Sequence, residues 1–420
     1  MKTHITTRSP TRLALASLTV LACCLCHNLP SVQAAPGSWT QKKDMPMAVG
    51  TPAGCEVDGI LYVAGGTAVT GPPASPVQTV FAYDPKTDAW TQKKDMPTAR
   101  YFAAAGAVNG IIYVVGGNGA WYPPTDSVEA YDPKTDTWMT KARLSSPRWL
   151  VTACALDGII YAIGGADANN NAVATVEAYD PATDQWTPKA SLPVASERGV
   201  AQAVNGIIYT FFDKNTFAYD PKTNGWTRMA PIPAWTLASG ASVSGVVSNI
   251  VYLFGGLSSN DSTPYNFTLA YDPAGNNFFA KRLMPVSCEG TNCASTRVYA
   301  ACATIGGKIY VTGGANASPA VDPRAFFCRS TWMFDPEGGV TPQISALTLD
   351  STNSVRLAWQ GEAGIRYSVQ SRSNVAAGAW TRLMFSTGTY GILATNALVE
   401  ATCPVPTTDA QRFFRIFEAN

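Results

Sequence analysis

Arginine side chains recur at equivalent positions of this sequence, where they could bind an anion. Arg100, Arg148 and Arg297 each stand ten residues before an equivalent glycine. Arg198 lies near the matching position but is offset by two. A guanidinium group donates paired hydrogen bonds to a carboxylate, so several of them around one axis would bind an acidic group. The alternative is that each arginine pairs with a neighbouring acid or with loop carbonyl groups.

Aromatic residues accompany these arginines. Trp149 follows Arg148 directly, and other large rings lie in segments expected on the same face of the molecule. Exposed aromatic rings stack on sugars or on apolar side chains. Packing between repeats is the alternative, and it is favoured for Trp149. The predicted ligand-binding residues are Arg100, Arg148, Arg198, Arg297, Trp121, Tyr122, Trp149 and Trp235.

The chain offers little for catalysis once its first 35 residues are set aside. Both histidines, His4 and His27, lie there. A Ser-His-Asp triad and an imidazole-bound zinc or copper site are therefore excluded from the remainder. We expect no metal and no cofactor. Glu197 and Glu289 are left as candidates for a general acid or base, with solvated loop charges as the alternative.

The first 35 residues have the pattern of a secretory signal peptide. Three basic residues precede an apolar run over 13–26, and small residues over 32–34 offer a cleavage site. The run is short for a membrane span, which needs about 20 apolar residues. We expect a secreted, periplasmic or cell-surface protein with no transmembrane segment in the mature chain. A lipid anchor at Cys23 is the alternative.

The composition of the remaining chain bears on its partners. Three of the 30 basic residues lie in the signal peptide, which leaves 27 against 29 acids. No basic run remains, so we expect no nucleic-acid partner. Seven of the ten cysteines also remain, in a protein expected to be exported. Cys288 and Cys293 could close a small loop as a disulfide, with two free thiols as the alternative.

One pattern organises most of the chain. In its clearest copy, a short apolar run ends in the pair Gly164-Gly165, a variable loop follows, and then come a Tyr-Asp-Pro-x-Thr turn and Trp186. Runs such as 159–163 are too short and too β-branched for helices, so each copy predicts about four short strands. One four-stranded unit cannot bury both of its faces, whereas copies stacked around an axis can.

This pattern resembles the kelch repeat, with its period of about 50 residues, its glycine pair and its spaced tyrosine and tryptophan. The resemblance covers roughly residues 36–336 and implies a β-propeller. The stretch 39–46 is the last strand of a repeat without a beginning, and the sixth copy ends after 334–336 without a tryptophan strand. We therefore predict an all-β fold: a six-bladed kelch β-propeller over 36–340, closed by its N-terminal strand.

The variable loops of such a propeller open on one face, together with the connections between blades. Long loops rich in Gly, Pro and Asn on a rigid scaffold indicate a binding surface, with simple sequence drift as the alternative. Blade four departs from the pattern, because Phe211-Phe212 replaces the glycine pair and the loop over 213–215 is the shortest.

The last 80 residues, 341–420, lack the repeat. Short runs that alternate between apolar and polar residues predict a small β-sandwich. The spacing of the runs around Trp359, Tyr367, Trp380 and Phe413 resembles a fibronectin type III-like module of bacterial secreted proteins. That resemblance implies a module that spaces or presents the larger domain. The chain ends at Asn420, which leaves little room for a final strand.

These features favour a binding or adhesion protein that recognises a protein or carbohydrate ligand on the loop face, with an anionic group as a candidate. The alternative is a carbohydrate-active enzyme resembling the kelch-type sialic-acid mutarotases, which would use arginines and a carboxylate. A deep pocket that joins arginines to an acid would favour the enzyme, and a broad shallow surface would favour the binding protein. Fold alone does not decide between them.

Overall fold

The computed structural model describes residues 37–68, 75–119, 123–233, 242–256, 267–285, 297–315 and 327–338 with their side chains. It describes a further set of short strands, between 238 and 418, by their backbone. The predicted signal peptide lies outside the described residues. Among the described residues there is no helix that is long and apolar enough to cross a membrane.

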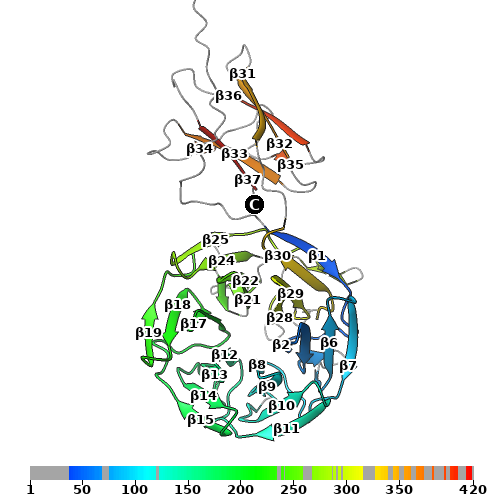
Figure 1. Cartoon of the computed structure of the whole chain (residues 1–420), viewed down its shortest axis with the longest axis vertical. Coiled ribbons are helices and arrows are strands. Elements are labelled where there is room, and N and C mark those ends of the chain that lie inside the picture. Colours follow the sequence, from blue (N-terminus) through cyan, green and yellow to red (C-terminus); the bar gives the residue numbers. More distant parts are fainter. Residues whose placement is uncertain are drawn as a thin grey trace, which may run out of the picture. The chain divides into compact units, whose positions relative to one another are not determined.

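Six four-stranded antiparallel sheets surround a central axis, as the blades of a propeller (Figure 1). Their innermost strands, β2, β8, β12, β16, β21 and β28, neighbour one another in a closed ring. Blades one to three contain β2 (Ala53–Val57), β3 (Ile60–Ala64), β6 (Val80–Asp84) and β7 (Ala89–Lys93); β8 (Ala104–Val108), β9 (Ile111–Val115), β10 (Val128–Asp132) and β11 (Thr137–Lys141); and β12 (Thr152–Leu156), β13 (Ile159–Ile163), β14 (Val176–Asp180) and β15 (Gln185–Pro188). Blades four to six contain β16 (Val200–Val204), β17 (Ile207–Phe212), β18 (Asn215–Asp220) and β19 (Gly225–Arg228); β21 (Val243–Val247), β22 (Ile250–Phe254), β24 (Thr268–Asp272) and β25 (Asn277–Ala280); and β28 (Ala301–Ile305), β29 (Lys308–Thr312), β30 (Thr331–Asp335) and β1 (Ser38–Lys42).

The N-terminal strand closes the ring, as predicted. β1 pairs with β30 in antiparallel register, with Trp39 opposite Phe334. The Trp39 ring lies 5.0 Å from the Phe334 ring and 5.2 Å from the Phe254 ring of blade five, measured between centroids. Its indole nitrogen donates to the Arg282 carbonyl oxygen at 3.2 Å. The first strand of the propeller therefore completes the last blade and leaves no open edge there.

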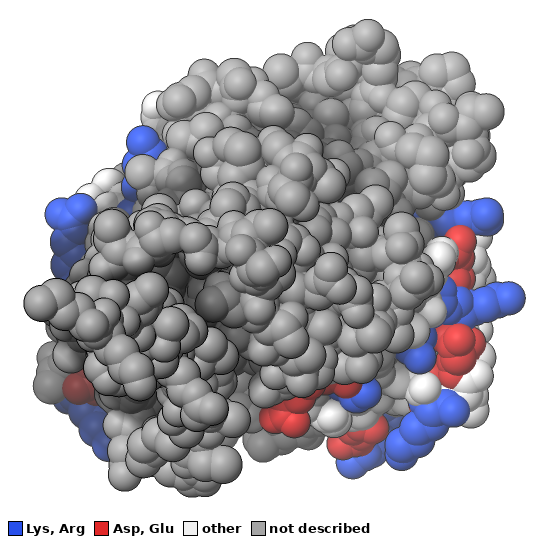
Figure 2. Space-filling view, turned by 90° about the horizontal axis from the view of Figure 1, so that it is seen from above, with Lys and Arg blue, Asp and Glu red and all other residues white. Residues whose placement is uncertain are grey.

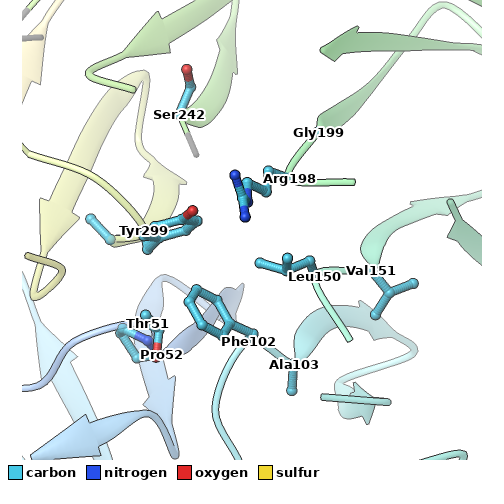
Figure 3. A pocket seen from close by; sticks show the side chains of 11 residues that line it. Thr51, Pro52, Phe102, Ala103, Leu150, Val151, Arg198, Gly199, Ser242 and Tyr299 are labelled. Atoms are coloured by element: carbon cyan, nitrogen blue, oxygen red, sulfur yellow. The ribbon is translucent and has the colours of Figure 1, made fainter. Parts of the chain in front are cut away.

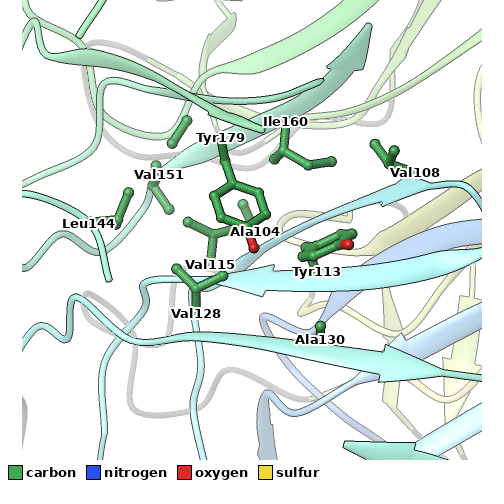
Figure 4. Packing of buried hydrophobic residues seen from close by; sticks show 11 residues of the cluster. Ala104, Val108, Tyr113, Val115, Val128, Ala130, Leu144, Val151, Ile160 and Tyr179 are labelled. Atoms are coloured by element: carbon green, nitrogen blue, oxygen red, sulfur yellow. The ribbon is translucent and has the colours of Figure 1, made fainter. Parts of the chain in front are cut away.

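The hydrophobic core lies between blades. Figure 4 shows Tyr179 and Ile160 of blade three packed against Val115 and Val128 of blade two, and all four are fully buried. Equivalent clusters fill the other junctions between blades. Each sheet thus buries its faces only against its neighbours, so the second strand of a blade, such as β9 or β13, is apolar on both faces.

The glycine pair holds the loop ends of adjacent blades together. Gly116 and Gly117 have φ angles of 61° and 97°, which a residue with a side chain rarely adopts. A Cβ atom at Gly116 would lie 2.5 Å from the carbonyl oxygen of Arg148, to which the Gly117 amide donates at 2.9 Å. The pair therefore allows close contact with the next blade and turns the chain out of the sheet into the variable loop.

A hydrogen-bonded latch joins adjacent blades at the opposite end of the strands. In blade two, Asp136 accepts from the Tyr131 hydroxyl at 2.5 Å and from the Lys94 amide at 2.8 Å. The indole nitrogen of Trp138 donates to the Lys94 carbonyl oxygen at 2.9 Å. Lys94 follows the last strand of blade one, so two side chains of blade two bind the backbone of its neighbour, and Tyr131 binds one of them. The same latch acceptor is present as Asp88, Asp184, Asn224 and Asn276.

Smaller sheets complete the described backbone. On the loop side, β4 (Thr67–Ala68) pairs with β5 (Ser75–Pro76), β20 (Ala238–Gly240) with β23 (Leu257–Ser258), and β26 (Ser287–Glu289) with β27 (Asn292–Ala294). In the tail, β31 (Ile344–Leu349), β32 (Ser354–Gln360) and β36 (Leu398–Pro404) form one sheet; β33 (Arg366–Arg372) pairs with β34 (Thr381–Arg382), β35 (Ile392–Leu393) and β37 (Phe413–Glu418).

Several expectations for these segments stay predictions. The tail strands pair antiparallel, but the sandwich, its likeness to fibronectin type III and the domain boundaries at 36, 340 and 341 are not tested. Cys288 lies opposite Cys293 in the β26–β27 ladder. Their side chains lie outside the described residues, so the disulfide is also untested.

The latch predicts a specific response to acid. Hydrogen bonds from Tyr131 and the Lys94 amide lower the pKa of Asp136. A carboxyl group with a lowered native pKa stabilises the fold above its ordinary pKa, and this contribution is lost as the pH falls through the native value. Replacing Asp88, Asp136 and Asp184 by Asn should therefore flatten the loss of stability below about pH 4, measured by urea unfolding across pH.

The control is already present in the chain, because Asn224 and Asn276 hold the same latch without a titrating group. Asp136→Ala, which removes the acceptor, should cost about 1 kcal/mol at neutral pH. If the stability of the triple Asn variant fell below about pH 4 as steeply as that of the wild type, other groups would control acid unfolding.

Candidate functional site

Arg100 is buried inside the protein, where both of its terminal nitrogens have partners. Its guanidinium group donates to the Glu129 carboxylate at 2.6 Å and to the carbonyl oxygens of Gly116 and Ser127 at 3.1 and 2.9 Å. The Arg100 side chain is 0% exposed and that of Glu129 is 5% exposed. Desolvation lowers the pKa of Arg100, and the Glu129 charge opposes that shift. Arg100 thus fastens the segment before blade two to the second and third strands of that blade.

Arg148 and Arg297 are buried in the same manner. Arg148 pairs with Glu177 and donates to the carbonyl oxygens of Gly164 and Thr175 at 2.9 and 3.1 Å. Arg297 donates to the Ser330 carbonyl oxygen at 3.0 Å and to the Ser330 hydroxyl. The prediction that Arg100, Arg148 and Arg297 converge on one anion is therefore wrong. Each points into its own blade, where a carboxylate or carbonyl oxygens already satisfy it.

The sequence contained a signal for this arrangement. Glu129 and Glu177 each stand two residues before the repeat tyrosine, in the two blades that carry Arg100 and Arg148. Blades one and four have a phenylalanine at that place, Phe81 or Phe217, and no arginine at the matching position. Arginine and glutamate thus occur together in blades two and three, whereas Arg297 of blade six has Trp332 at the place of the glutamate.

The structure places a different set of residues at the centre of the loop face, the side of the propeller on which the second strand of each blade ends. A pocket of about 90 Å³ opens there, and all six blades contribute to it. Figure 3 shows the rings of Phe102 and Tyr299, the Leu150 side chain and the Arg198 guanidinium group directed toward its centre. The full lining is Thr51, Pro52, Phe102, Ala103, Leu150, Val151, Arg198, Gly199, Ser242, Tyr299 and Ala300.

Five of the lining residues, here called the ring residues, have a left-handed backbone conformation that directs their side chains toward the pocket. One residue of each of five blades stands two positions before the innermost strand and has a positive φ angle: Thr51 (55°), Phe102 (53°), Leu150 (52°), Arg198 (61°) and Tyr299 (52°). Such a conformation is strained for bulky or β-branched residues and needs support from its surroundings. Backbone hydrogen bonds supply that support. They run from the Phe102 amide to the Thr51 carbonyl, from Leu150 to Phe102 and from Arg198 to Leu150, at 3.2, 3.1 and 3.4 Å.

The pocket combines an apolar wall with a few polar groups. The Phe102 and Tyr299 rings meet edge to face, with centroids 4.8 Å apart. Arg198 is the charged residue of the lining; its side chain is 38% exposed and lies 3.3 Å from the Glu197 carboxylate. Burial raises the pKa of Tyr299 to about 12, so its hydroxyl stays protonated. Thr51 Oγ1 and Arg198 Nε are buried atoms without a hydrogen-bond partner within the described chain, as are the Nε atoms of Arg100 and Arg148.

The other predicted site residues fall into two groups. Trp149 does not line the pocket but supports it, because its ring packs edge to face on Phe102 at 5.4 Å. Trp121, Tyr122 and Trp235 lie outside the described residues, as does the side chain of Glu289. Arg198 is therefore the predicted residue that the structure places in the pocket. Thr51, Phe102, Leu150 and Tyr299 were not identified from the sequence, because their residue types do not indicate a left-handed conformation.

A metal-binding cluster or a reactive thiol would be another kind of site among the described residues. No group of three His, Cys, Asp or Glu side chains is close enough to hold a metal ion within the described ranges. Burial raises the pKa of both Cys55 and Cys154 to about 12, which keeps these thiols protonated and unreactive. Figure 2 shows basic and acidic side chains interspersed along one edge of the described surface.

Comparisons with known proteins agree with this architecture. The model of the KLHDC2/KLHL20/DRC7 kelch-repeats domain matches residues 51–256, and that of the kelch motif matches residues 296–340. An F-box/kelch-repeat protein of Arabidopsis thaliana is 38% identical over 80 residues, which is 19% of this chain and only 20% of that relative's length. The solved structure of YjhT superposes with a TM-score of 0.55 at 14% identity, over 70% of this chain and 96% of that one. At this identity the likeness is one of fold.

The buried ion pairs predict large effects on stability. Arg148→Ala should destabilise the propeller by about 3–5 kcal/mol, because Glu177 would keep a buried charge without a partner. Urea unfolding followed by tryptophan fluorescence measures this loss. Replacing both residues, as Arg148→Met with Glu177→Leu, should recover most of it.

Arg143→Ala is the matched control, since Arg143 pairs with Asp126 at 2.8 Å on the surface with its side chain 64% exposed. That change should cost less than about 1 kcal/mol. If Arg148→Ala kept wild-type stability and instead weakened ligand binding, Arg148 would return to the candidate site.

Proposed function

Because the chain is a kelch-repeat β-propeller, we propose that it is a binding protein that receives a protruding group of a protein or carbohydrate ligand in the pocket of its loop face. The observation that supports this most is the convergence of all six blades on that pocket. A lining drawn from the whole ring, with side chains directed by a strained backbone, is an arrangement that stability alone does not require.

The chemistry of the pocket indicates what the bound group should carry. Phe102 and Leu150 provide apolar contact, and the Arg198 guanidinium group, on a side chain that is 38% exposed, provides hydrogen-bond donors. These donors can bind an oxygen atom of the ligand. A carboxylate on an apolar or aromatic framework fits these groups well, and the guanidinium charge strengthens the contact.

The size of the pocket favours binding over catalysis. Its volume is about 90 Å³, whereas sites that enclose whole small molecules usually measure about 300–1,000 Å³. One amino-acid side chain or one sugar substituent fits, and the rest of the ligand would lie outside. This is the geometry expected of a protein that grips a protruding group of a larger partner.

We also propose that the protein acts outside the cytoplasm. Support comes from the signal-peptide pattern of residues 1–35, with a lipid anchor at Cys23 as the alternative. The tail after residue 340 would then space or present the propeller. The intact mass of the exported protein tests this: cleavage after Ala34 or Ala35 supports release, lipidation of Cys23 supports anchoring, and an uncleaved chain contradicts both.

A second candidate function is a carbohydrate mutarotase, which the acids beside Arg198 favour. Glu197 contacts Arg198, and desolvation together with the Glu197 charge raises the pKa of Asp213. Opening and reclosing a sugar ring needs a proton donor and an acceptor, which such acids can supply. Proton NMR of N-acetylneuraminic acid anomers tests this activity. Acceleration that disappears in Glu197→Gln would establish it, and an uncatalysed rate would exclude it for that sugar.

The binding function predicts that Arg198 determines affinity. Arg198→Ala should weaken a carboxylate-bearing ligand about 10-fold or more, because a charge-assisted hydrogen bond contributes about 1.5–3 kcal/mol. Calorimetric titration with an acidic ligand, selected by screening glycans and peptides on residues 36–420, measures the change.

Arg198→Lys should recover only part of the affinity, since an ammonium group cannot donate through two planar nitrogens. Arg143→Ala is the control, because Arg143 does not line the pocket. Equal affinities of the wild-type and Arg198→Ala proteins would remove Arg198 from the binding site.

A further inference from the structure

The residue three positions before the innermost strand has a described backbone partner in every blade except blade four. In five blades it pairs antiparallel with the residue that follows the glycine pair of the same blade. These pairs are Gly50 with Thr67, Tyr101 with Asn118, Trp149 with Ala166, Gly240 with Leu257 and Val298 with Ala315. The first residue of each variable loop therefore lies as a short extended segment beside the rim of the pocket.

These pairs are made by ordinary backbone hydrogen bonds. Where both bonds are described, they run in both directions between the partners. Trp149 donates to the Ala166 carbonyl at 3.1 Å, and Ala166 donates to the Trp149 carbonyl at 2.8 Å. The Tyr101 and Asn118 pair repeats this at 3.0 and 2.8 Å. Each loop thus satisfies the backbone groups at its own section of the rim.

Blade four does not make this pair, because a phenylalanine replaces a glycine. Phe211 pairs with Val200 as Ile163 pairs with Thr152, so Phe212 and Asp213, and not Phe211 and Phe212 as the sequence pattern predicted, stand where the other blades have the glycine pair. Asp213 has a φ angle of 51°, but the buried Phe212 does not readily adopt the φ angle of about 60° of the first glycine. β17 therefore continues straight to Phe212, and the chain returns at Asn215 after the two-residue turn Asp213-Lys214.

Glu197 occupies the rim position of blade four. It directly precedes Arg198, as Trp149 precedes Leu150. Among the described residues, no backbone group pairs with the Glu197 amide. Its carbonyl oxygen accepts only a long bond of 3.4 Å from the Ser196 hydroxyl. Among the described residues, the backbone edge that the other blades pair with their own loops is thus unpaired beside the pocket's charged residue.

We propose that the ligand is an extended polypeptide segment that pairs with the backbone of Glu197, places one side chain in the pocket beside Arg198 and leaves across the short turn of blade four. This inference rests on the proposed binding function and gives its ligand class. The segment would make in blade four the contact that the chain's own loops make in the other five. Addition of a strand to an open edge is a general mode of peptide recognition.

Backbone pairing is what favours a polypeptide over a carbohydrate. A peptide has the alternating donor and acceptor spacing that an uncovered strand edge needs, and a glycan does not. The pocket volume of about 90 Å³ also suits a single side chain. The ligand's neighbouring residues would then pass over Asp213 and Lys214, the two-residue turn that is blade four's own loop.

The probe is a displayed library of linear 12-residue peptides, selected on wild-type residues 36–420. The test variant gives blade four the loop of blade three: Phe212-Asp213 becomes Gly-Gly, and residues 166–175 replace Lys214-Asn215. The control variant inserts ten residues of Gly and Ser at the turn between Asn205 and Gly206, on the opposite face. The loop variant should bind the selected peptides at least about 10-fold more weakly, and the control should bind as wild type does.

A second measurement uses only the wild-type protein and so does not depend on the folding of the loop variant. Selected peptides are N-methylated at one amide at a time. If one peptide residue pairs with Glu197, methylation should weaken binding about 10-fold at that single amide or at it and one neighbour, and leave the other positions unaffected.

The outcomes separate the two proposals. Peptide binding that depends on Arg198 but is insensitive to both the loop graft and N-methylation would overturn the pairing inference and leave the pocket function intact. Enrichment of glycans with no enrichment of peptides would overturn the inference in the same way. If no peptide or glycan bound in an Arg198-dependent manner, the proposed function itself would fall.

Discussion

The contact between one blade and the next is the constraint on which the whole structure depends. No blade has a core of its own, because the buried side chains lie between sheets. Hydrogen bonds reinforce both ends of each junction. At one end an Asp or Asn joins the repeat tyrosine to the backbone of the preceding blade, and at the other a glycine pair binds the following blade. Stability is therefore a property of the closed ring.

The same junctions generate the pocket. Amides and carbonyls of successive blades bond around the axis and hold Phe102, Leu150 and Arg198 in the left-handed conformation. Each such residue costs about 1 kcal/mol or more in isolation. Contacts between all the blades of the closed ring fix this backbone, so the fold tolerates the strain and the pocket side chains stay directed inward. The pocket is thus built by the architecture rather than by any one repeat.

Departures from repeat symmetry make the six blades differ from one another. The Arg–Glu pairs occur in two blades and make those blades more polar inside without reaching the surface. Phe212 changes blade four more profoundly, because it replaces the first glycine of the pair, continues the strand and leaves a loop of two residues. A nearly six-fold scaffold acquires one distinct side in this way, and that side also carries Glu197 and Arg198.

The sequence by itself determined the elements and their closure. Short β-branched runs, glycine pairs and Tyr-Asp-Pro turns act through local sterics and turn geometry, so the strands, the six blades and the role of residues 38–42 could be read directly. Equivalent spacing correctly grouped Arg100, Arg148 and Arg297 but could not give the direction of their side chains. Only the tertiary structure decided that, since the partners of the first two lie 29 residues further along the chain. The pocket was likewise beyond the sequence, because bonds between blades, and not the residue types, impose the left-handed backbone that forms it.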